Sequence, residues 1–275
     1  MTALFRFLSL FPLWLLQGLG WLLGWVAFGL SGVYRQRFLA NAGQAGVGWR
    51  QWRGAVGQAG ALVAELPRLW LGRPVPIHWQ GAEHIEAALA QGCGIVFLTP
   101  HLGCFEITAQ AYAQRYGQRQ AMTVLFRPPR QSWLRALVAT ARHRPGLHTA
   151  PTTLAGVKQM LKALRRGQSV GLLPDQVPPQ GLGVWAPFFG RPAYTMTLSI
   201  RLVQQTGAAV LVAWGERLAW GRGFRVHVRP LALDLPADMT LAATHINQAM
   251  EQLIGECPRQ YLWGYARYKQ PREEL

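Results

Sequence analysis

Residues 94–106 read Gly94-Ile95-Val96-Phe97-Leu98-Thr99-Pro100-His101-Leu102-Gly103-Cys104-Phe105-Glu106. The apolar run 95–98 is typical of a buried strand, and Pro100 and Gly103 indicate a loop after it. Residues 105–115 then predict a helix. A histidine is therefore expected just past the carboxyl end of a strand, which is where open α/β sheets carry their chemistry.

The alternation of strands and helices continues on both sides of this stretch. Strands are expected at residues 75–79, 95–98, 122–126, 170–173, 209–214 and 224–228, and helices at 83–90, 105–115, 133–142, 154–165, 195–206 and 245–255. Residues 34–70 are also expected to be helical, with Pro67 weakening the end of that segment. The alternation predicts an α/β fold, a layered and largely parallel sheet with flanking helices.

His101 and Glu106 form the candidate catalytic pair. Five positions correspond to a separation of about 140° on a helix, so the two can meet only if His101 lies in the loop before it. A carboxylate can hold one imidazole nitrogen and leave the other free to take a proton from a hydroxyl. We expect His101 to act as general base in acyl transfer and Glu106 to fix its tautomer. The alternative is a loop histidine followed by a helix-capping glutamate.

Residues 167–171 match the G-x-S-x-G pattern of serine hydrolases, with Ser169 at its centre. That motif needs a strand before the serine and a helix after it. Here a helix precedes Ser169 and a strand follows, so we expect no nucleophilic serine.

Asp175 follows the strand expected at 170–173, so it should lie on the same rim of the sheet as His101 if the two strands are parallel. The loop 177–193 contains Phe188 and Phe189 near its end. Exposed aromatic side chains on a long loop over the rim predict a lid or a wall for an acyl chain. A structural turn or cap at Asp175 is the alternative.

A cluster of arginines follows the strand expected at 122–126. Arg127, Arg130, Arg142 and Arg144 are candidates for binding the phosphate of a lipid headgroup or of a phosphopantetheine carrier. The alternative is a solvated basic surface.

The N-terminal segment is apolar over an unusual length. Residues 7–33 carry no charge, and a helix of about 20 residues crosses the hydrocarbon core of a bilayer. A spanning helix is expected. Pro12 and several glycines leave a kinked or re-entrant insertion open, and a cleaved signal peptide is a further alternative. Arg35 and Arg37 follow at once, so the positive-inside rule places the downstream domain in the cytoplasm.

The composition points to an acidic partner. The net charge is +16, and the 28 basic residues include only three lysines. Nucleic acid, anionic lipid and an acidic protein all fit such a surface. The three cysteines, in no C-x-x-C spacing, argue against a disulfide framework or a zinc site. No metal is therefore expected.

The chain resembles a known family at several points, in order. Residues 99–106 resemble the His-x4-acid box of the bacterial lipid A late (secondary) acyltransferases, within the lysophospholipid acyltransferase superfamily. Phe126-Arg127-Pro128, Arg142-His143-Arg144, Pro174-Asp175-Gln176, Pro187-Phe188-Phe189-Gly190 and Pro258-Arg259-Gln260-Tyr261-Leu262-Trp263 resemble further elements of that family. The similarity extends over about residues 1–272.

The resemblance implies a glycerolipid acyltransferase-like α/β fold with a membrane anchor at 1–33 and a cytoplasmic acyltransferase domain at 34–275. It implies transfer of a fatty acyl chain to a hydroxyl of a lipid A precursor at the bacterial inner membrane. The donor would be acyl carrier protein, or coenzyme A, as its thioester, with no other cofactor. His101 and Glu106 would be the dyad. Arg127, Arg142, Arg144, Asp175, Phe188 and Phe189 would bind substrate.

Two other functions stay open at this point. The same box would serve an enzyme that acylates a lysophospholipid or another membrane lysolipid. A membrane-anchored protein that binds anionic lipid or nucleic acid would also suit the charge, although no nucleic-acid module is recognised and nucleic acid is not expected.

Overall fold

A computed structural model describes residues 2–126, 131, 135, 137–138, 144–232 and 236–273. Its centre is a seven-stranded sheet of order β1-β9-β8-β2-β5-β3-β4. The strands are β1 (Ile77–Gln80), β2 (Ile95–Leu98), β3 (Met122–Phe126), β4 (Leu147–Pro151), β5 (Ser169–Leu172), β8 (Ala209–Arg217) and β9 (Phe224–Pro230). β8 and β9 pair antiparallel, whereas the other neighbouring strands pair parallel. The predicted α/β class and largely parallel sheet are confirmed.

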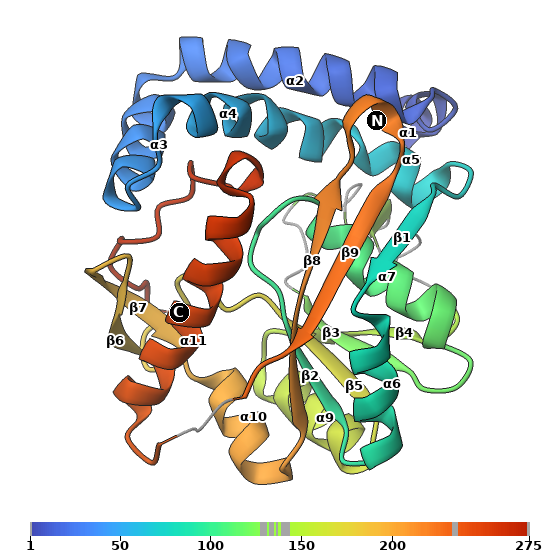
Figure 1. Ribbon diagram of the computed structural model, residues 1–275, viewed down its shortest axis with the longest axis vertical. Helices are drawn as coiled ribbons and strands as arrows, with labels where there is room; N and C mark the ends of the chain where they lie inside the picture. Colours follow the sequence, from blue (N-terminus) through green and yellow to red (C-terminus); the bar gives the residue numbers. More distant parts are fainter. Residues whose placement is uncertain are drawn as a thin grey trace.

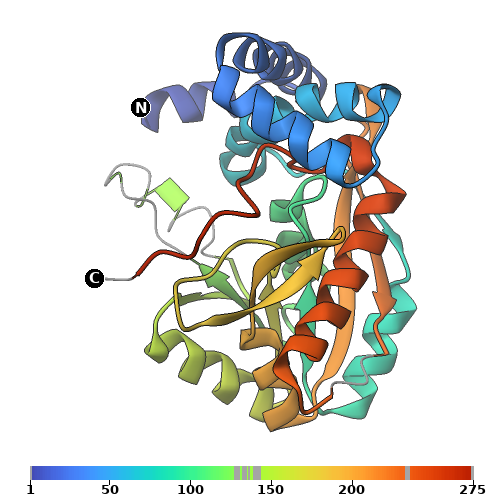
Figure 2. The same cartoon turned by 90° about the vertical axis from the view of Figure 1, so that its left-hand side faces the viewer.

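Helices cover both faces of the sheet (Figures 1 and 2). α6 (Ala82–Gln91) and α7 (Phe105–Tyr116) pack on one face, and α9 (Leu154–Arg165), α10 (Leu198–Thr206) and α11 (Met239–Glu256) lie on the other. Strand β2 is buried on both sides, so Ile95 and Phe97 join one core cluster while Val96 and Leu98 join the other. Such two-sided burial explains why the sequence of β2 is a continuous apolar run.

The N-terminal helices form a separate layer. This layer contains α1 (Thr2–Leu8), α2 (Leu13–Leu30), α3 (Gly32–Gln44), α4 (Trp49–Ala64) and α5 (Leu66–Leu71). Figure 1 shows α2 and α4 lying side by side across the end of the sheet towards which β2 and β8 run. Among the described residues, α2 is the one helix that is long and apolar enough to cross a membrane, and a third of it is buried in the protein.

Glycines bring α2 and α4 into backbone contact. A Cβ atom on Gly60 would lie 2.0 Å from the carbonyl oxygen of Gly20, and one on Gly24 would lie 2.4 Å from that of Val56. Spacings of small residues that allow such an approach are typical of close helix pairs in membrane proteins. The segment 1–33 is therefore packed along the rest of the chain.

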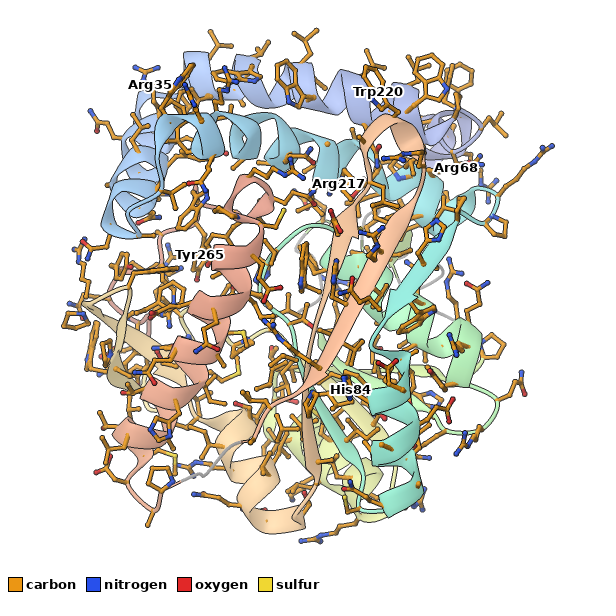
Figure 3. All side chains as sticks on the ribbon, viewed as in Figure 1. Arg35, Arg68, His84, Arg217, Trp220 and Tyr265 are labelled. Atoms are coloured by element: carbon orange, nitrogen blue, oxygen red, sulfur yellow. The ribbon has the colours of Figure 1, made fainter. Side chains whose placement is uncertain are left out.

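A buried ion pair joins this layer to the sheet. The guanidinium of Arg217, at the end of β8, donates to both carboxylate oxygens of Glu65 at 2.6 and 2.7 Å, and Gln17 of α2 donates to the same carboxylate at 3.0 Å. Burial disfavours the charged guanidinium, but Glu65 outweighs this effect and raises the pKa of Arg217. Figure 3 shows Arg217 directly beneath α4.

Several elements differ from the sequence-based expectation. The helical segment 34–70 is three helices, and Pro67 lies in the first turn of α5, where its missing N–H costs nothing. β4 was not expected, because it is short, has exposed polar residues at the adjacent positions His148 and Thr149, and ends at Pro151. Residues 183–188 and 191–196 form an antiparallel hairpin, β6 (Gly183–Phe188) and β7 (Arg191–Met196), in place of a loop. The helix predicted at 133–142 lies mostly outside the described residues.

Candidate active site

His101 lies in the loop between β2 and α7, held by a carboxylate from the neighbouring strand. Asp175 follows β5, which pairs parallel with β2, so the two loops adjoin. Its Oδ2 accepts a hydrogen bond from the backbone N–H of His101 at 2.8 Å, and its Oδ1 lies 2.8 Å from Nδ1 of the imidazole. The predicted common rim of His101 and Asp175 is confirmed.

Asp175 is held as a carboxylate. It is 1% exposed, and this burial taken alone would raise its pKa. The charge of His101 and the two hydrogen bonds from that residue, with a further contribution from Arg267, more than offset burial, so the pKa of Asp175 is lowered from its ordinary value. An ionised Asp175 accepts a hydrogen bond from a protonated Nδ1. The neutral imidazole then has its free lone pair on Nε2.

The Nε2 atom of His101 faces an amide. The side-chain nitrogen of Gln176 lies 2.9 Å away and donates to Nε2. The imidazole is 14% exposed, so the site is partly shielded from solvent. A substrate hydroxyl that gives its proton to Nε2 would have to take the place of this amide.

Two residues of the C-terminal segment form hydrogen bonds to Asp175 and His101. The buried Tyr261 hydroxyl donates to Oδ2 of Asp175 at 3.2 Å, and the backbone N–H of Leu262 donates to the carbonyl of His101 at 3.2 Å. Burial, followed by the nearby carboxylate, raises the pKa of Tyr261 well above its ordinary value, so the hydroxyl keeps its proton.

Gly103 makes the turn that separates His101 from α7. Its φ is +61°, and a Cβ atom there would lie 2.0 Å from the carbonyl oxygen of Gly215 in β8. Its N–H donates to the carbonyl of Gln260, and the next N–H, of Cys104, donates to Gly215. The break expected from Pro100 and Gly103 is therefore present, and it is held by β8 and the C-terminal segment.

Glu106 does not make the contact expected of it. The prediction that Glu106 holds the imidazole tautomer is corrected, because Asp175 occupies Nδ1. Glu106 projects instead from the first turn of α7, and its Oε2 accepts a hydrogen bond from the indole of Trp70 at 3.4 Å. The orientation of the first turn of α7 explains this direction. The ring of Phe105 packs edge-on against His101 with 4.8 Å between ring centroids, so the next residue, Glu106, points elsewhere. A direct catalytic role for Glu106 stays a prediction.

An apolar cavity of about 80 Å³ lies next to the loop that carries His101, lined by the neighbouring residues Thr99 and Phe105 but not by His101 or Asp175 themselves. It lies between α7 and the sheet, with Glu106 and Thr99 among its few polar lining residues and Phe97, Phe105 and Ile85 among its apolar ones. Its lining is mostly apolar, as in sites that bury the apolar parts of ligands.

Arg144 lies at a second cavity, of about 380 Å³, on the outer side of α7. Arg68, Arg73 and Gln110 also line this cavity, and Nη2 of Arg144 donates to the carbonyl of Leu69 at 2.9 Å. Burial lowers the pKa of Arg144 from its ordinary value. Arg127, Arg130 and Arg142 lie outside the described residues.

Phe188 and Phe189 are not exposed over the rim, which corrects the expected lid. Phe188 is 2% exposed in the core, and its ring stacks under the guanidinium of Arg267 at 5.0 Å. Phe189, at the turn of the β6–β7 hairpin, packs against Trp263. The hairpin turns these rings towards the C-terminal segment and away from the cavity beside Glu106.

The exclusion of Ser169 can be compared with its surroundings. Ser169 is buried at the start of β5 and hydrogen bonds to Tyr112 at 2.8 Å, which agrees with its exclusion as a nucleophile. Within the described part of the chain, His, Cys, Asp and Glu form no group of three that could hold a metal ion.

Sequence reasoning missed three residues of the site, Gln176, Tyr261 and Trp70. Gln176 and Tyr261 stand in two of the elements that resemble the family, but neither was assigned a role in the site. Trp70 contacts Glu106 across 36 residues, and no local pattern reveals such a contact.

Comparison with known proteins decides the family. The sequence model described as bacterial lipid A biosynthesis acyltransferase matches residues 65–270, which include every site residue named above. The chain belongs to this family.

The sequence identity to individual relatives is below 30%. The chain is 26% identical over 191 residues to a lipid A biosynthesis palmitoleoyltransferase of Escherichia coli (69% of this chain, 60% of the relative). It is 29% identical over 210 residues to the lipid A biosynthesis myristoyltransferase of the same organism (75% of this chain, 63% of the relative). A phosphatidylinositol mannoside acyltransferase of Mycobacterium tuberculosis is 28% identical over 148 residues, 51% of this chain and 45% of the relative. The matches thus span less than two thirds of these relatives' own length.

Proposed function

We propose that this protein is an O-acyltransferase that moves a fatty acyl chain from a thioester donor to a hydroxyl of a lipid A precursor. The observation that carries the proposal is the His101–Asp175 pair, in which Nδ1 is held by a carboxylate at 2.8 Å. An apolar cavity lined by Thr99, Phe105 and Glu106 lies next to the same loop. Family membership supports the acceptor class, because its described members act in lipid A biosynthesis.

In the proposed reaction, Nε2 of His101 takes the proton of the acceptor hydroxyl as its oxygen attacks the thioester carbonyl carbon. The tetrahedral intermediate collapses, the carbon–sulfur bond breaks, and the leaving thiolate takes the proton back from the imidazolium. The products are an ester and a free thiol. Asp175 stabilises the imidazolium in between, as the aspartate of a catalytic triad does.

Glu106 is proposed to act on the substrate side of the same site. Its carboxylate lines the cavity next to Phe105, so it can accept a hydrogen bond from an acceptor hydroxyl and orient it towards His101. This role differs from that of a partner to the imidazole, and it predicts a different response to substitution.

The two cavities suit the two parts of such a substrate pair. The apolar cavity under α7 suits the acyl chain. The cavity lined by Arg68, Arg73 and Arg144 suits an anionic group of the glycolipid acceptor, since guanidinium groups bind phosphate oxygens in bidentate fashion. Arg127 and Arg142 belong to the same basic stretch of sequence and are proposed to join in this binding.

We propose acyl carrier protein as the donor, with coenzyme A as the alternative. Acyl carrier protein is acidic, and the net charge of +16 favours its encounter with this chain. The proposed reaction needs no metal and no cofactor beyond the thioester. Its place would be the cytoplasmic side of the bacterial inner membrane.

The test is an assay in membranes with acyl carrier protein thioester as donor and a lipid A precursor as acceptor. We expect His101→Ala to lower turnover by about 1,000-fold or more while the variant stays folded. Full activity of this variant would end the proposal. Competition with a lysophospholipid acceptor in the same assay tests the second candidate function, which the match to an acyltransferase for a different glycolipid keeps in view.

A further inference from the structure

Gln176 lies between two residues whose positions are fixed by contacts with distant parts of the chain. Before it, Asp175 is hydrogen bonded to His101 through both carboxylate oxygens, across 74 residues. After it, the backbone N–H of Val177 donates to the hydroxyl of Tyr265 at 3.0 Å, across 88 residues. Figure 3 shows Tyr265 on the C-terminal segment that follows α11. The backbone at Gln176 is therefore anchored on both sides.

The side chain of Gln176 is held less firmly than its backbone. Among the residues that the structure describes, it has one hydrogen-bond partner, Nε2 of His101, at 2.9 Å from its amide nitrogen. The side chain is only partly buried, and several rotatable bonds separate its amide from the anchored backbone. A glutamine amide nitrogen carries two N–H donors, so the bond to Nε2 uses only one of them. The amide can therefore turn away from Nε2 while the backbone stays in place.

The acceptor hydroxyl and the amide of Gln176 compete for Nε2 of His101. This atom has a single lone pair when Asp175 accepts from Nδ1, and a hydroxyl that gives up its proton needs that lone pair. The amide must therefore leave Nε2 when the acceptor takes its place. Because the amide nitrogen starts 2.9 Å from Nε2, its N–H groups stay beside the thioester carbonyl that the hydroxyl attacks.

The loop that carries His101, residues 99–104, has no spare backbone donor for the charge that develops on that carbonyl oxygen. Acyl transfer passes through a tetrahedral intermediate, whose oxyanion is stabilised by hydrogen-bond donors placed around it. Pro100 has no N–H. The other backbone N–H groups of the loop all donate to protein oxygens, with Thr99 donating to Leu172, His101 to Asp175, Leu102 to Pro100, Gly103 to Gln260 and Cys104 to Gly215. A donor for the oxyanion is therefore expected from outside this loop.

We propose that the amide of Gln176 is an oxyanion donor in the acyl transfer proposed above, on which this inference rests. The hydroxyl oxygen bonds to the thioester carbon as its proton passes to Nε2 of His101. The π electrons of the carbonyl move onto its oxygen, and the N–H of Gln176 donates to that oxygen. When the intermediate collapses, the electrons return, the carbon–sulfur bond breaks, and the leaving thiolate takes the proton from the imidazolium.

The first experiment measures the steady-state kinetics of Gln176→Leu, which keeps the approximate size of the side chain and removes its donors. Loss of one oxyanion donor costs about 100- to 1,000-fold in kcat. We expect this loss in acyl transfer and in slow hydrolysis of the thioester alike, with neither KM raised, because both reactions pass through the same kind of oxyanion. Gln180→Leu is the matched control, since Gln180 is exposed in the same loop between β5 and β6. It should leave both rates unchanged.

The second experiment replaces the carbonyl oxygen of the acyl donor by sulfur. The negative charge of a dithioester develops on sulfur, which accepts hydrogen bonds weakly. An enzyme that uses an N–H donor at this atom should therefore prefer the thioester, and we expect that preference to fall by about tenfold or more in Gln176→Leu. A role of Gln176 in structure alone would slow the two donors equally and leave their ratio unchanged.

Each of these measurements can overturn the proposed role of Gln176. An unchanged kcat in Gln176→Leu would show that the amide does not support the oxyanion. Faster hydrolysis with a lower KM for the acceptor would show that the amide only obstructs Nε2. An unchanged ratio of the two donors would assign the loss to disturbed structure, which urea unfolding measures separately. Failure of the proposed function itself looks different, because the wild type and His101→Ala would then be equally inactive with the thioester, and the role of Gln176 would fall with it.

Discussion

The carboxylate of Asp175 holds His101 twice, through the backbone N–H and through Nδ1, each at 2.8 Å across 74 residues of sequence. One acidic side chain thus fixes both the position of the loop and the tautomer of the ring. Because the two hydrogen bonds use different oxygens, the imidazole plane is set as well as its location.

Removing the charge of Asp175 should therefore affect turnover more than binding. Asp175→Asn is expected to lower kcat by roughly 100- to 10,000-fold with little change in KM, since the imidazolium loses its stabilising charge while the substrate cavities stay intact. Steady-state kinetics measure both constants. Asp238→Asn, at the N-cap of α11, removes an exposed carboxylate and is the control. A rise in KM with kcat unchanged would assign Asp175 to substrate binding instead.

The same carboxylate makes stability depend on pH. The folded state lowers the pKa of Asp175 below its ordinary value of 3.8, so the unfolded chain takes up a proton first as the pH falls. The stability that the ionised group contributes is complete above the ordinary pKa and is lost as the pH falls below it. The urea concentration at the midpoint of unfolding should fall as the pH is lowered from neutral, and it should fall more steeply for the wild type than for Asp175→Asn. Parallel pH curves would contradict this.

Glu106 should respond to substitution differently from Asp175. If its carboxylate orients the acceptor, Glu106→Gln keeps part of the hydrogen bonding and is expected to raise the acceptor's KM as well as lower kcat. A donor-only side reaction, slow hydrolysis of the thioester to water, should persist in Glu106→Gln and be lost in His101→Ala. Loss of hydrolysis in both variants would return Glu106 to the role of partner to His101.

The turn at Gly103 offers a test of how tightly the loop is built. Gly103→Ala meets both a positive φ and a Cβ position 2.0 Å from the carbonyl oxygen of Gly215, whereas Gly46→Ala meets a positive φ with open space around it. We expect about 1 kcal/mol of destabilisation at Gly46 and at least about 3 kcal/mol at Gly103, with loss of activity only in the latter. Chemical denaturation and the acyltransferase assay measure the two effects. Equal losses of stability in the two variants would mean that the backbone at Gly215 can move away from the added Cβ atom without strain.

The buried pair of Glu65 and Arg217 predicts a large stability effect. Arg217→Met leaves an uncompensated carboxylate that is 0% exposed, for a cost of about 3–5 kcal/mol. Arg119→Ala removes one partner of the exposed pair with Glu86 and should cost at most about 1 kcal/mol. Adding Glu65→Gln to Arg217→Met should restore part of the loss, and its failure to do so would show that the hydrogen bonds of Arg217 matter more than its charge.

The cavity beside α7 predicts a change in acyl-chain preference. Ala109 lines it, so Ala109→Leu fills part of the available volume and should shift the products towards shorter chains. Mass spectrometry of the glycolipid products measures the shift. Ala87→Leu adds the same side chain on the exposed side of α6 and should leave the products unchanged.

Local patterns in the sequence were enough to predict β2, the turn after it and α7. The strand is an apolar run buried on both faces, and its end carries Pro100 and Gly103, so each signal is contained within a few residues. The β6–β7 hairpin was missed because Pro187 and Pro192 lie directly opposite each other in it, and prolines in a short strand indicate a loop when only the sequence is considered.

The choice of Asp175 over Glu106 could not be made from the sequence. Both carboxylates were expected near His101, and only the direction of the first turn of α7 separates them. That direction depends on Gly103 and Cys104 being held by Gln260 and Gly215, contacts that cross more than a hundred residues. Packing of Phe188 and Phe189 against the C-terminal segment has the same long-range origin.

The β8–β9 hairpin connects a protruding side chain to the loop that carries His101. Its tip carries Trp220, and five residues before it the carbonyl of Gly215 accepts the N–H of Cys104 at 2.8 Å in the loop that carries His101. Any displacement of the tip would therefore be passed along a single strand to the turn at Cys104, and from there to the ring that this turn positions.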